Sequence, residues 1–497
     1  MTSRHESKVN CSSSMKSNSP KAKPHDKGNC PAAPFNPAKS FGISVRTDVL
    51  RQIDLMKAEY EAMKNEELLS RDDGLPHKRF SCRDNSTEMT IPNCVRFMLT
   101  MNSGDIFHEL VFSTMFDEEN VPSASTYCQV RDKIPMASFE RLFYWFANKY
   151  YWKVHYDLMG IRMLAVDGTE DSYPHNPNEP DNCVRTRSET KARNLIHANV
   201  CFDPVLHFVV DVIPQDAHAK DERQALYAFM QRIAKRYPNP DQRILNLFTS
   251  DRGYEAWNLP VLAESLGVSY LCRIKSEESN GILSGIKHLL PVERNSFDRV
   301  ITITLTRDPS KKGRPGYHYL QPGTYCELVT HGHDYTVEIR IVKIRISDTV
   351  TEYLFTNLRK SAYSKAGLMH LYHKRWNVET AIGFVKYPLA MAAPHAASSV
   401  PITKEMWCRF LMYNICSVIA YQDDYLEKKE ATGKKYDYTR DFSSAIDVIV
   451  VFMRGDKIYD IDSKVQKLTR PIRIIEEPRE RNKTGGRKNL PFNHRMG

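Results

Sequence analysis

The distribution of apolar residues changes after about residue 40. Residues 1–40 are rich in Ser, Asn, Lys and Pro and contain few large apolar side chains. Such a segment cannot bury enough surface to offset the entropy that is lost on ordering. Apolar residues then recur at helical spacing from about 41 to 155, with helices predicted at 92–101, 123–134 and 138–151. The pattern therefore predicts a disordered basic arm over 1–40 and a helical domain over 41–155.

A second pattern, of short apolar runs, begins near residue 162. Three runs in quick succession predict neighbouring strands, and strands alternate with helices after them. The predicted order is strand 163–168, strand 195–202, strand 206–214, helix 221–237, strand 244–251, helix 258–267 and strand 269–274. This succession predicts an α/β fold with a mixed sheet and helices on its faces. We assign residues 156–297 to the first part of this core.

Between residues 298 and 356 the helical pattern disappears. The runs RVITITLTR, YTVEIRIVKIRI and TEYLFTNL alternate apolar and polar residues and are separated by two Pro-Gly pairs. Alternation with a period of two is typical of antiparallel strands that expose one face. Residues 298–356 are therefore predicted to form an antiparallel β insertion. Helical periodicity returns over 357–425, the second part of the core, and 426–497 are predicted to form a C-terminal helical region with a basic tail.

Composition narrows the class of protein. The net charge of +10 favours a polyanionic partner such as nucleic acid, although unrelated proteins are often this basic. The eleven cysteines show neither zinc-ligand spacing nor a disulfide framework, which predicts reduced thiols. No run approaches the roughly 18 consecutive apolar residues of a membrane span, and the N-terminus lacks an apolar signal core. These features exclude a membrane protein and a disulfide-rich secreted domain, and they predict a cytoplasmic location.

Two aspartates end predicted strands. Asp167 is followed by Gly-Thr, and Asp251 is followed by Arg-Gly. An acid at the carboxyl end of a strand lies where open α/β sheets build their sites. Each aspartate alone is better explained by turn chemistry, because Asp-Gly is a common turn pair. Two such positions in one sheet favour a site for a hard cation such as Mg²⁺.

A third acid lies in the segment LYHKRWNVETAIGFVKYP. On a helix of about 100° per residue, Tyr372, Arg375, Glu379 and Lys386 fall within an arc of about 60°. This arrangement suits a phosphodiester and a metal ion; the alternative is a solvated face whose charges pair at i,i+3 and i,i+4. The neighbouring apolar edge would pack on the sheet through Leu368, Leu371, Val378, Ile382 and Val385.

The chemistry that these residues favour is phosphodiester cleavage. In-line displacement at phosphorus is served by two divalent ions about 4 Å apart, which need carboxylates from converging elements. Asp167, Asp251 and Glu379 are therefore the predicted catalytic residues and metal ligands. On the residues alone, the chain is predicted to be a metal-dependent enzyme that acts on nucleic acid.

The same residues resemble the DDE transposases of bacterial insertion sequences, in particular insertion-sequence family four. Those proteins carry the motif Tyr-x2-Arg-x3-Glu-x6-Lys around the third acid, and Tyr372, Arg375, Glu379 and Lys386 match it. The D-G-T and D-R-G sequences around the two aspartates are also similar to the family's first and second acid motifs. The resemblance spans roughly residues 80–420.

The resemblance implies a fold, a reaction and partners. The fold would be an RNase H-like mixed-sheet catalytic core, interrupted by the β insertion and preceded by a helical DNA-binding domain. The enzyme would bind the inverted-repeat ends of its own element as a homodimer, in the cytoplasm near the nucleoid. Two Mg²⁺ ions, with Mn²⁺ as a substitute, would serve strand cleavage, hairpin formation and joining of the 3′-OH ends to target DNA.

Further residues are assigned to DNA by the resemblance. Tyr372, Arg375 and Lys386 would contact the DNA backbone, and Arg252 beside the second acid is a further candidate. Relatives use an aromatic residue in the insertion, usually Trp, to stack on a flipped base. None of the five tryptophans lies within 298–356, so Tyr353 is the nearest candidate.

Three alternatives stay open. The predicted helix at 123–134 carries Arg131 and other side chains that can reach phosphates, but a solvated helix face explains them equally well. The chain could be an RNase H-like nuclease that lacks strand transfer. It could also be a binding protein that descends from a transposase and has lost catalysis, although three intact acids argue against this.

Overall fold

The structure, a computed structural model, describes residues 40–65, 89–117, 119–151, 160–185, 191–236, 245–347, 350–421, 436–455 and 460–473. All of them belong to one compact unit that begins at Ser40. The basic arm predicted over 1–40 lies outside the described residues except for Ser40. Residues 474–497, most of the predicted basic tail, also lie outside them.

The described residues form the following helices and strands. The helices are α1 (Phe41–Asn65), α2 (Ile91–Thr100), α3 (Ile106–Val111), α4 (Ala124–Lys133), α5 (Met136–Tyr150), α6 (Glu222–Arg236), α7 (Leu259–Ser265), α8 (Ile282–Ile286), α9 (Lys365–Lys374), α10 (Asn377–Lys386), α11 (Ser399–Ala420), α12 (Phe442–Arg454) and α13 (Ile461–Gln466). The strands are β1 (Ile161–Tyr173), β2 (Cys183–Val184), β3 (Arg193–Asp203), β4 (Phe208–Asp216), β5 (Leu245–Ser250), β6 (Ser269–Ile274), β7 (Phe297–Thr306), β8 (Tyr317–Tyr319), β9 (Tyr335–Arg345), β10 (Thr351–Thr356), β11 (Tyr436–Arg440) and β12 (Thr469–Arg473).

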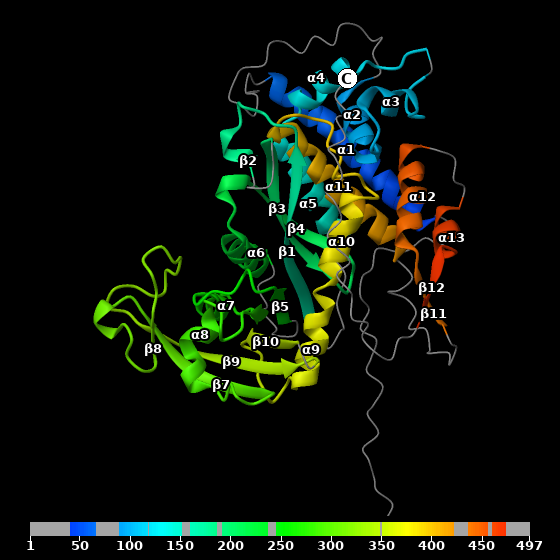
Figure 1. The fold of residues 1–497 in the computed structure, drawn as a ribbon. Helices are drawn as coiled ribbons and strands as arrows, with labels where there is room; N and C mark the ends of the chain where they lie inside the picture. Colours follow the sequence, from blue (N-terminus) through cyan, green and yellow to red (C-terminus); the bar gives the residue numbers. More distant parts are fainter. Residues whose placement is uncertain are drawn as a thin grey trace, which may run out of the picture. The chain divides into compact units, whose positions relative to one another are not determined.

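One mixed sheet of ten strands organises the chain (Figure 1). Its order is β2-β3-β1-β5-β6-β10-β9-β7-β8, and β4 also pairs with β3. β1, β5 and β6 are parallel, whereas β3 and β10 pair antiparallel to this central group. The predicted mixed α/β fold is confirmed, and so are the predicted strands and helices of the first part of the core.

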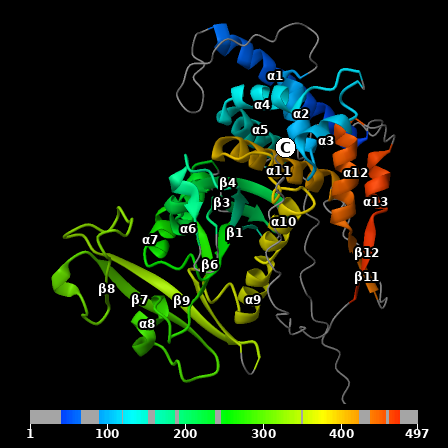
Figure 2. The same ribbon diagram turned by 45° about the horizontal axis from the view of Figure 1, so that its top comes forward.

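The segment predicted as a β insertion extends this same sheet. β7 pairs antiparallel with β9, and β9 pairs antiparallel with β10, as the alternating pattern predicted. β10 in turn pairs with β6, so the insertion adds strands to the central sheet instead of forming a separate one. Figure 2 shows β7 and β9 at the end of the sheet that lies away from α11.

Helix α11 joins the N-terminal helices to the sheet. It is buried along almost its whole length, with α5 and α2 among its helical neighbours and β4 among its contacts on the sheet. The amide of Asn414 on α11 forms 2.8 Å hydrogen bonds with both the N–H and the carbonyl of Val209. Helices α1, α2 and α5 therefore share one hydrophobic core with the sheet, and the predicted boundary near residue 155 falls inside that core.

A cluster of buried charges fixes α4 to α11. The Arg131 guanidinium is buried, with Nε 3.0 Å from Asp132 Oδ1 and Nη1 3.7 Å from Glu405 Oε1. His395 Nδ1 lies 3.2 Å from Glu405 Oε2, and Arg409 is buried beside them. We call Arg131, His395, Glu405 and Arg409 the buried cluster. The interpretation of Arg131 as a phosphate contact is wrong in this structure, because its guanidinium faces a carboxylate inside the core.

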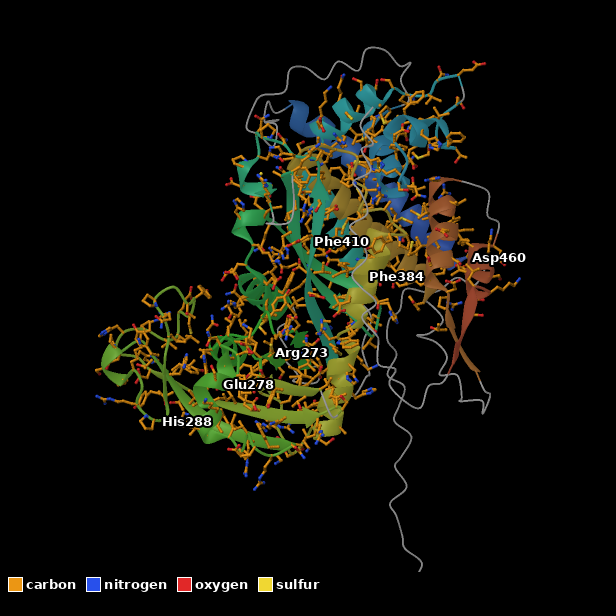
Figure 3. All side chains as sticks on the ribbon, in the orientation of Figure 1. Arg273, Glu278, His288, Phe384, Phe410 and Asp460 are labelled. Carbon is orange, nitrogen blue, oxygen red and sulfur yellow. The ribbon has the colours of Figure 1, made fainter. Side chains whose placement is uncertain are left out.

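The C-terminal segment is helical, as predicted, but it also contains two strands. Phe442 at the start of α12 meets Phe384 on α10 edge-on, with ring centroids 5.0 Å apart. Figure 3 labels Phe384 on α10. β11 and β12 form an antiparallel pair that the sequence did not predict, because Pro471 lies inside β12 and a proline within a short run argues against a strand.

Two expectations from composition can be compared with the described ranges. The cysteines there are free thiols, several of them buried, as predicted. Within the same ranges, none of the helices combines the length and the apolar character that crossing a membrane requires.

Candidate active site

The first two predicted acids lie level with each other on neighbouring parallel strands. β1 and β5 are paired from Ile161 to Ala165, with Ala165 opposite Thr249. Continuing this register by two residues places Asp167 beside Asp251, which directly follows β5. The prediction that Asp167 ends its strand is wrong: β1 continues to Tyr173, because β3 still pairs with it where β5 has stopped. The end of β5 thus opens a site beside β1.

Backbone N–H groups hold both aspartates in place. Asp167 Oδ1 accepts a 3.0 Å hydrogen bond from the N–H of Gly168. Asp251 Oδ1 accepts a 2.8 Å hydrogen bond from the N–H of Gly253. The glycines of the two acid motifs therefore fix the carboxylates through their main chain.

Burial raises the pKa of Asp167 to about 6. Arg375 and the Gly168 N–H oppose this shift, whereas the negative charges of Glu379 and Asp251 add to it. Glu379 and Asp251 are therefore close enough to disfavour the ionisation of Asp167, and an added cation would offset this effect.

The helix predicted to carry the third acid is interrupted. α9 ends at Lys374 and α10 begins at Asn377, and the N–H groups of Arg375, Trp376 and Val378 bond to carbonyls three residues earlier. The prediction of one continuous helix with a single polar stripe is therefore wrong. The tight turn moves Tyr372 off the face that Glu379 and Lys386 share on α10.

Arg375 lies between two of the acids. Its Nη2 is 2.8 Å from Glu379 Oε1, and its Nη1 is 3.8 Å from Asp167 Oδ2. The Arg375 side chain is only 3% exposed, whereas the Glu379 side chain is 56% exposed. The buried guanidinium thus connects β1 to α10, and Glu379 faces the solvent beside it.

The described residues contain no group of three or more His, Cys, Asp or Glu side chains spaced to hold a metal ion. In this conformation the Arg375 guanidinium occupies the position between Asp167 and Glu379 that a cation would share. The convergence of the three acids on shared ions therefore stays a prediction.

The other two residues of the signature motif make intramolecular contacts. Tyr372 is fully buried, its ring lies 5.6 Å from the Arg375 guanidinium carbon, and burial raises its pKa to about 12. Lys386 donates a 2.8 Å hydrogen bond to the carbonyl of Glu170 on β1. It also lies near Asp171, whose pKa burial raises to about 8 against the opposing charge of Lys386. Tyr372 and Lys386 therefore both contact other residues of the protein around the site.

The remaining predicted DNA contacts differ in exposure. Arg252 is exposed beside Asp251. Tyr353 is 4% exposed, with Lys343 Nζ 5.4 Å from its ring centroid and Phe297 beside it. Its buried ring gives no support to a role in stacking on a base.

Aromatic residues that the sequence reading missed meet beside the site. Trp257 stacks on His318 of the insertion, with ring centroids 4.0 Å apart and planes at 24°. Both line an open groove of about 830 Å³ that also includes Glu222 and Gly253. Trp257 lies outside residues 298–356 in the sequence, and only the tertiary structure brings it against the insertion.

Comparison with known proteins connects this geometry to a family. The profile of the family described as "Transposase DDE domain" matches residues 159–415, more than half of the chain. The chain belongs to this family of DDE transposases. Its members are enzymes of DNA transposition that cut and join the DNA of mobile elements, and they typically use divalent metal ions.

The chain is also similar to a solved structure, that of a piggyBac transposase in a cryo-EM synaptic complex with hairpin DNA, at 9% identity and a TM-score of 0.42. That similarity covers 88% of this chain and 87% of the other. A search of curated proteins gave no match.

Proposed function

We propose that the chain is a cut-and-paste transposase with an RNase H-like core, in which Asp167, Asp251 and Glu379 act as one acidic triad. It would cleave the inverted-repeat ends of its own element, form and reopen hairpin ends, and join the 3′-OH ends to target DNA. The single observation that carries the proposal is the charge balance at the end of β5. Asp167 and Glu379 there share the Arg375 guanidinium, Asp251 lies near Asp167, and the pKa of Asp167 is raised to about 6.

The residues of this site fit divalent cations in charge and chemistry. Hard cations such as Mg²⁺ and Mn²⁺ take carboxylate oxygens, and an excess of carboxylate charge favours them over water. Asp167, Asp251 and Glu379 would hold the ions. When bound, such ions activate the attacking oxygen and stabilise the leaving oxygen of a phosphodiester.

Arg375 is the residue best suited to bind the scissile phosphate. Its Nε is buried and has no hydrogen-bond partner among the described residues, and its Nη1 makes only the long 3.8 Å ion pair with Asp167. Guanidinium donors that are incompletely satisfied in a buried position favour an anionic ligand with several oxygens, and a phosphate provides it. Tyr372 would orient the guanidinium from behind, and Lys386 would hold β1 against α10.

The stacked pair of Trp257 and His318 supports a base-stacking role better than Tyr353 does. Aromatic surfaces accept any base by stacking, at about 1–3 kcal/mol per base. The pair lies in the groove that also includes Glu222 and Gly253, so a displaced nucleotide could reach it from the cleaved strand. Arg252 would contact a neighbouring phosphate.

The N-terminal helices would provide end-specific contacts, together with the partner subunit of a synaptic dimer. Because α1, α2 and α5 share a core with α11, deletion of residues 1–155 would expose that core and unfold the protein. Substitution of exposed residues such as Gln129 on α4 is therefore the appropriate test of DNA recognition by these helices.

A plasmid assay tests the function directly. The full chain is incubated with Mg²⁺ and a plasmid that carries the DNA flanking its own gene, and nicks, hairpins and joined products are quantified separately. Asp251→Asn serves as the inactive control. Cleavage without joined products would indicate a nuclease, and binding without cleavage would indicate a DNA-binding protein that has lost catalysis.

A further inference from the structure

A fourth carboxylate, that of Glu222 at the start of α6, lies beside the predicted acids. Two glycines define its position. A Cβ atom added to Gly168 would lie 3.1 Å from Glu222 Oε1, and one added to Gly253 would lie 3.0 Å from Glu222 Oε2. The Cβ at Gly253 would also lie 3.1 Å from Asp251 Oδ1. One carboxylate therefore reaches the main chain of both acid motifs at once.

The approach of Glu222 is the tightest contact at Gly253, whereas at Gly168 the His197 ring comes closer still. Neither has a positive φ, so their backbone conformations are accessible to any residue. A side chain at Gly253 would instead fill the space between Glu222 and Asp251. The glycines in D-G-T and D-R-G thus leave room for a carboxylate from another element.

His197 on β3 gives independent evidence that something binds here. It is 1% exposed, and neither ring nitrogen has a hydrogen-bond partner among the described residues. Its Cε1 and Nε2 lie 2.7 and 3.0 Å from the same Cβ position at Gly168 that Glu222 approaches. An unpaired buried polar group costs about 1–3 kcal/mol, so a ring aimed at this position favours a ligand or its bound water.

Lys220 fixes the orientation of the Glu222 carboxylate. Its ammonium lies 3.3 Å from Glu222 Oε1 and 3.3 Å from Glu170 Oε1. One oxygen of Glu222 is thereby held by the lysine, and the other remains directed to Gly253 and Asp251. The arrangement leaves a carboxylate oxygen beside the second acid.

We propose that Glu222 is a fourth acidic residue of the active site and supplies an oxygen ligand to the divalent cation held by Asp251. This inference rests on the proposed function. Lys220 would act as a positioning residue, and His197 would bond to water or to a ligand in the same space. Hard cations take several oxygen ligands, and a fourth carboxylate provides one more.

Titration with Mn²⁺ in the absence of DNA tests the proposal without reference to activity. Isothermal calorimetry would measure affinity and stoichiometry for the full chain and for Glu222→Gln, Gly253→Ala, Glu170→Gln and Asp251→Asn. We expect Glu222→Gln and Gly253→Ala to weaken binding at least about tenfold or to remove one site. Glu170→Gln is the matched control: it removes the other partner of Lys220 but lies away from Gly253, so its affinity should stay within about twofold.

Each outcome decides a different question. Loss of affinity in Asp251→Asn with wild-type binding in Glu222→Gln and Gly253→Ala would overturn the inference and leave the proposed function intact. An equal loss in Glu170→Gln and Glu222→Gln would also overturn it, because the Lys220 network would then explain the effect. Absence of Mn²⁺ binding in the wild type, or unchanged binding in Asp251→Asn, would contradict the proposed metal site itself. If thermal unfolding shows that Glu222→Gln does not fold, Glu222→Asp decides: its shorter side chain should weaken Mn²⁺ binding, and wild-type affinity would overturn the inference.

Discussion

Two arginine-centred groups in this molecule combine the same residue types with opposite electrostatic results. At the end of β5, Arg375 faces Asp167 and Glu379. In the buried cluster, Arg131 faces Glu405 between α4 and α11. Both guanidiniums are almost completely buried, so burial of the arginine does not distinguish them.

The two arginine-centred groups differ in the pKa values of their carboxyl groups. Burial raises the pKa of Asp167 to about 6, with Glu379 and Asp251 adding to the shift. Burial also acts to raise the pKa of Glu405, but His395, Arg131 and Arg409 together bring it below its ordinary value. The open group has too few cations for its carboxylates, whereas the buried cluster has enough.

The two groups therefore differ in the balance between carboxylates and cations, and this balance distinguishes a candidate binding site from a structural ion pair. A carboxylate surrounded by cations stabilises the fold and needs no ligand. A group of carboxylates that share one arginine would be stabilised by an added cation, and the proposed active site rests on this difference.

The largest effect is expected at the acids of the open group. Asp251→Asn should reduce DNA cleavage at least about a thousandfold, because one of the carboxylates proposed to hold the cation is lost. The free energy of unfolding without metal should change by less than about 0.5 kcal/mol, as for other solvent-accessible substitutions. Single-turnover cleavage and urea unfolding would be measured on the same preparation. Retention of a tenth of the cleavage rate would show that Asp251 is not a catalytic ligand.

The reverse result is expected in the buried cluster. Glu405→Ala should lower the free energy of unfolding by about 3–5 kcal/mol, because Arg131 and Arg409 would lose a buried partner. Cleavage per folded molecule should be unchanged. Glu119→Ala, at an exposed position, is the matched control and should cost less than about 0.5 kcal/mol. A stable Glu405→Ala protein with impaired cleavage would reverse the roles of the two groups.

The pH dependence of stability should have opposite signs at the two carboxyl groups. The folded pKa of Asp167 lies above its unfolded value, so the metal-free protein loses stability at this residue as the pH rises from about 4 to about 6. The loss is on the order of 3 kcal/mol, and Asp167→Asn should abolish it. The folded pKa of Glu405 is lowered, so its contribution is present above pH 4.5 and is lost as the pH falls through the folded pKa.

Urea unfolding in the presence of a chelator, at several pH values from 3.5 to 7, would measure both effects. The advantage of Asp167→Asn over the wild type should grow between about pH 4 and pH 6 and then stay constant. The deficit of Glu405→Gln should shrink below pH 4.5. Parallel curves for Asp167→Asn and the wild type would mean that Asp167 is an ordinary exposed acid.

The smallest effect is expected at the exposed rim of the open group. Arg252→Ala should weaken DNA binding only a few-fold and flatten its log–log salt dependence by about one unit, because one phosphate contact is lost. Lys235→Ala is the matched control, since Lys235 lies at the other end of α6 from Glu222, about 20 Å away along the helix. Equal salt slopes for both variants would remove Arg252 from the DNA interface.

Much of the fold follows from local pattern. The strands 195–202, 244–251 and 269–274 and the helix 221–237 were predicted within a few residues, because their apolar periodicity is strong. The three acids could be singled out because each combines a chemical type with a place at a strand end or on a helix. Their family motif depends on spacing, which the sequence states directly.

Other features depend on contacts between distant segments. The helix breaks at Arg375 although no Gly or Pro lies there. Asp167 lies inside β1 only because β3 pairs with β1 beyond the end of β5. Glu222 and His197 look like ordinary helix and strand residues until Gly168 and Gly253 are seen to leave space for them.

Periodicity and residue type are enough to predict the α/β class, the order of the main elements and the three acids. The core ion pair of Arg131, the burial of Tyr353 and the position of Arg375 between two acids appear only in the folded chain. The physical reason is that burial and charge balance are set by neighbours hundreds of residues away: Arg131 and Glu405 are in contact across α4 and α11. The pattern of apolar and polar residues along the chain does not indicate which distant residues become neighbours.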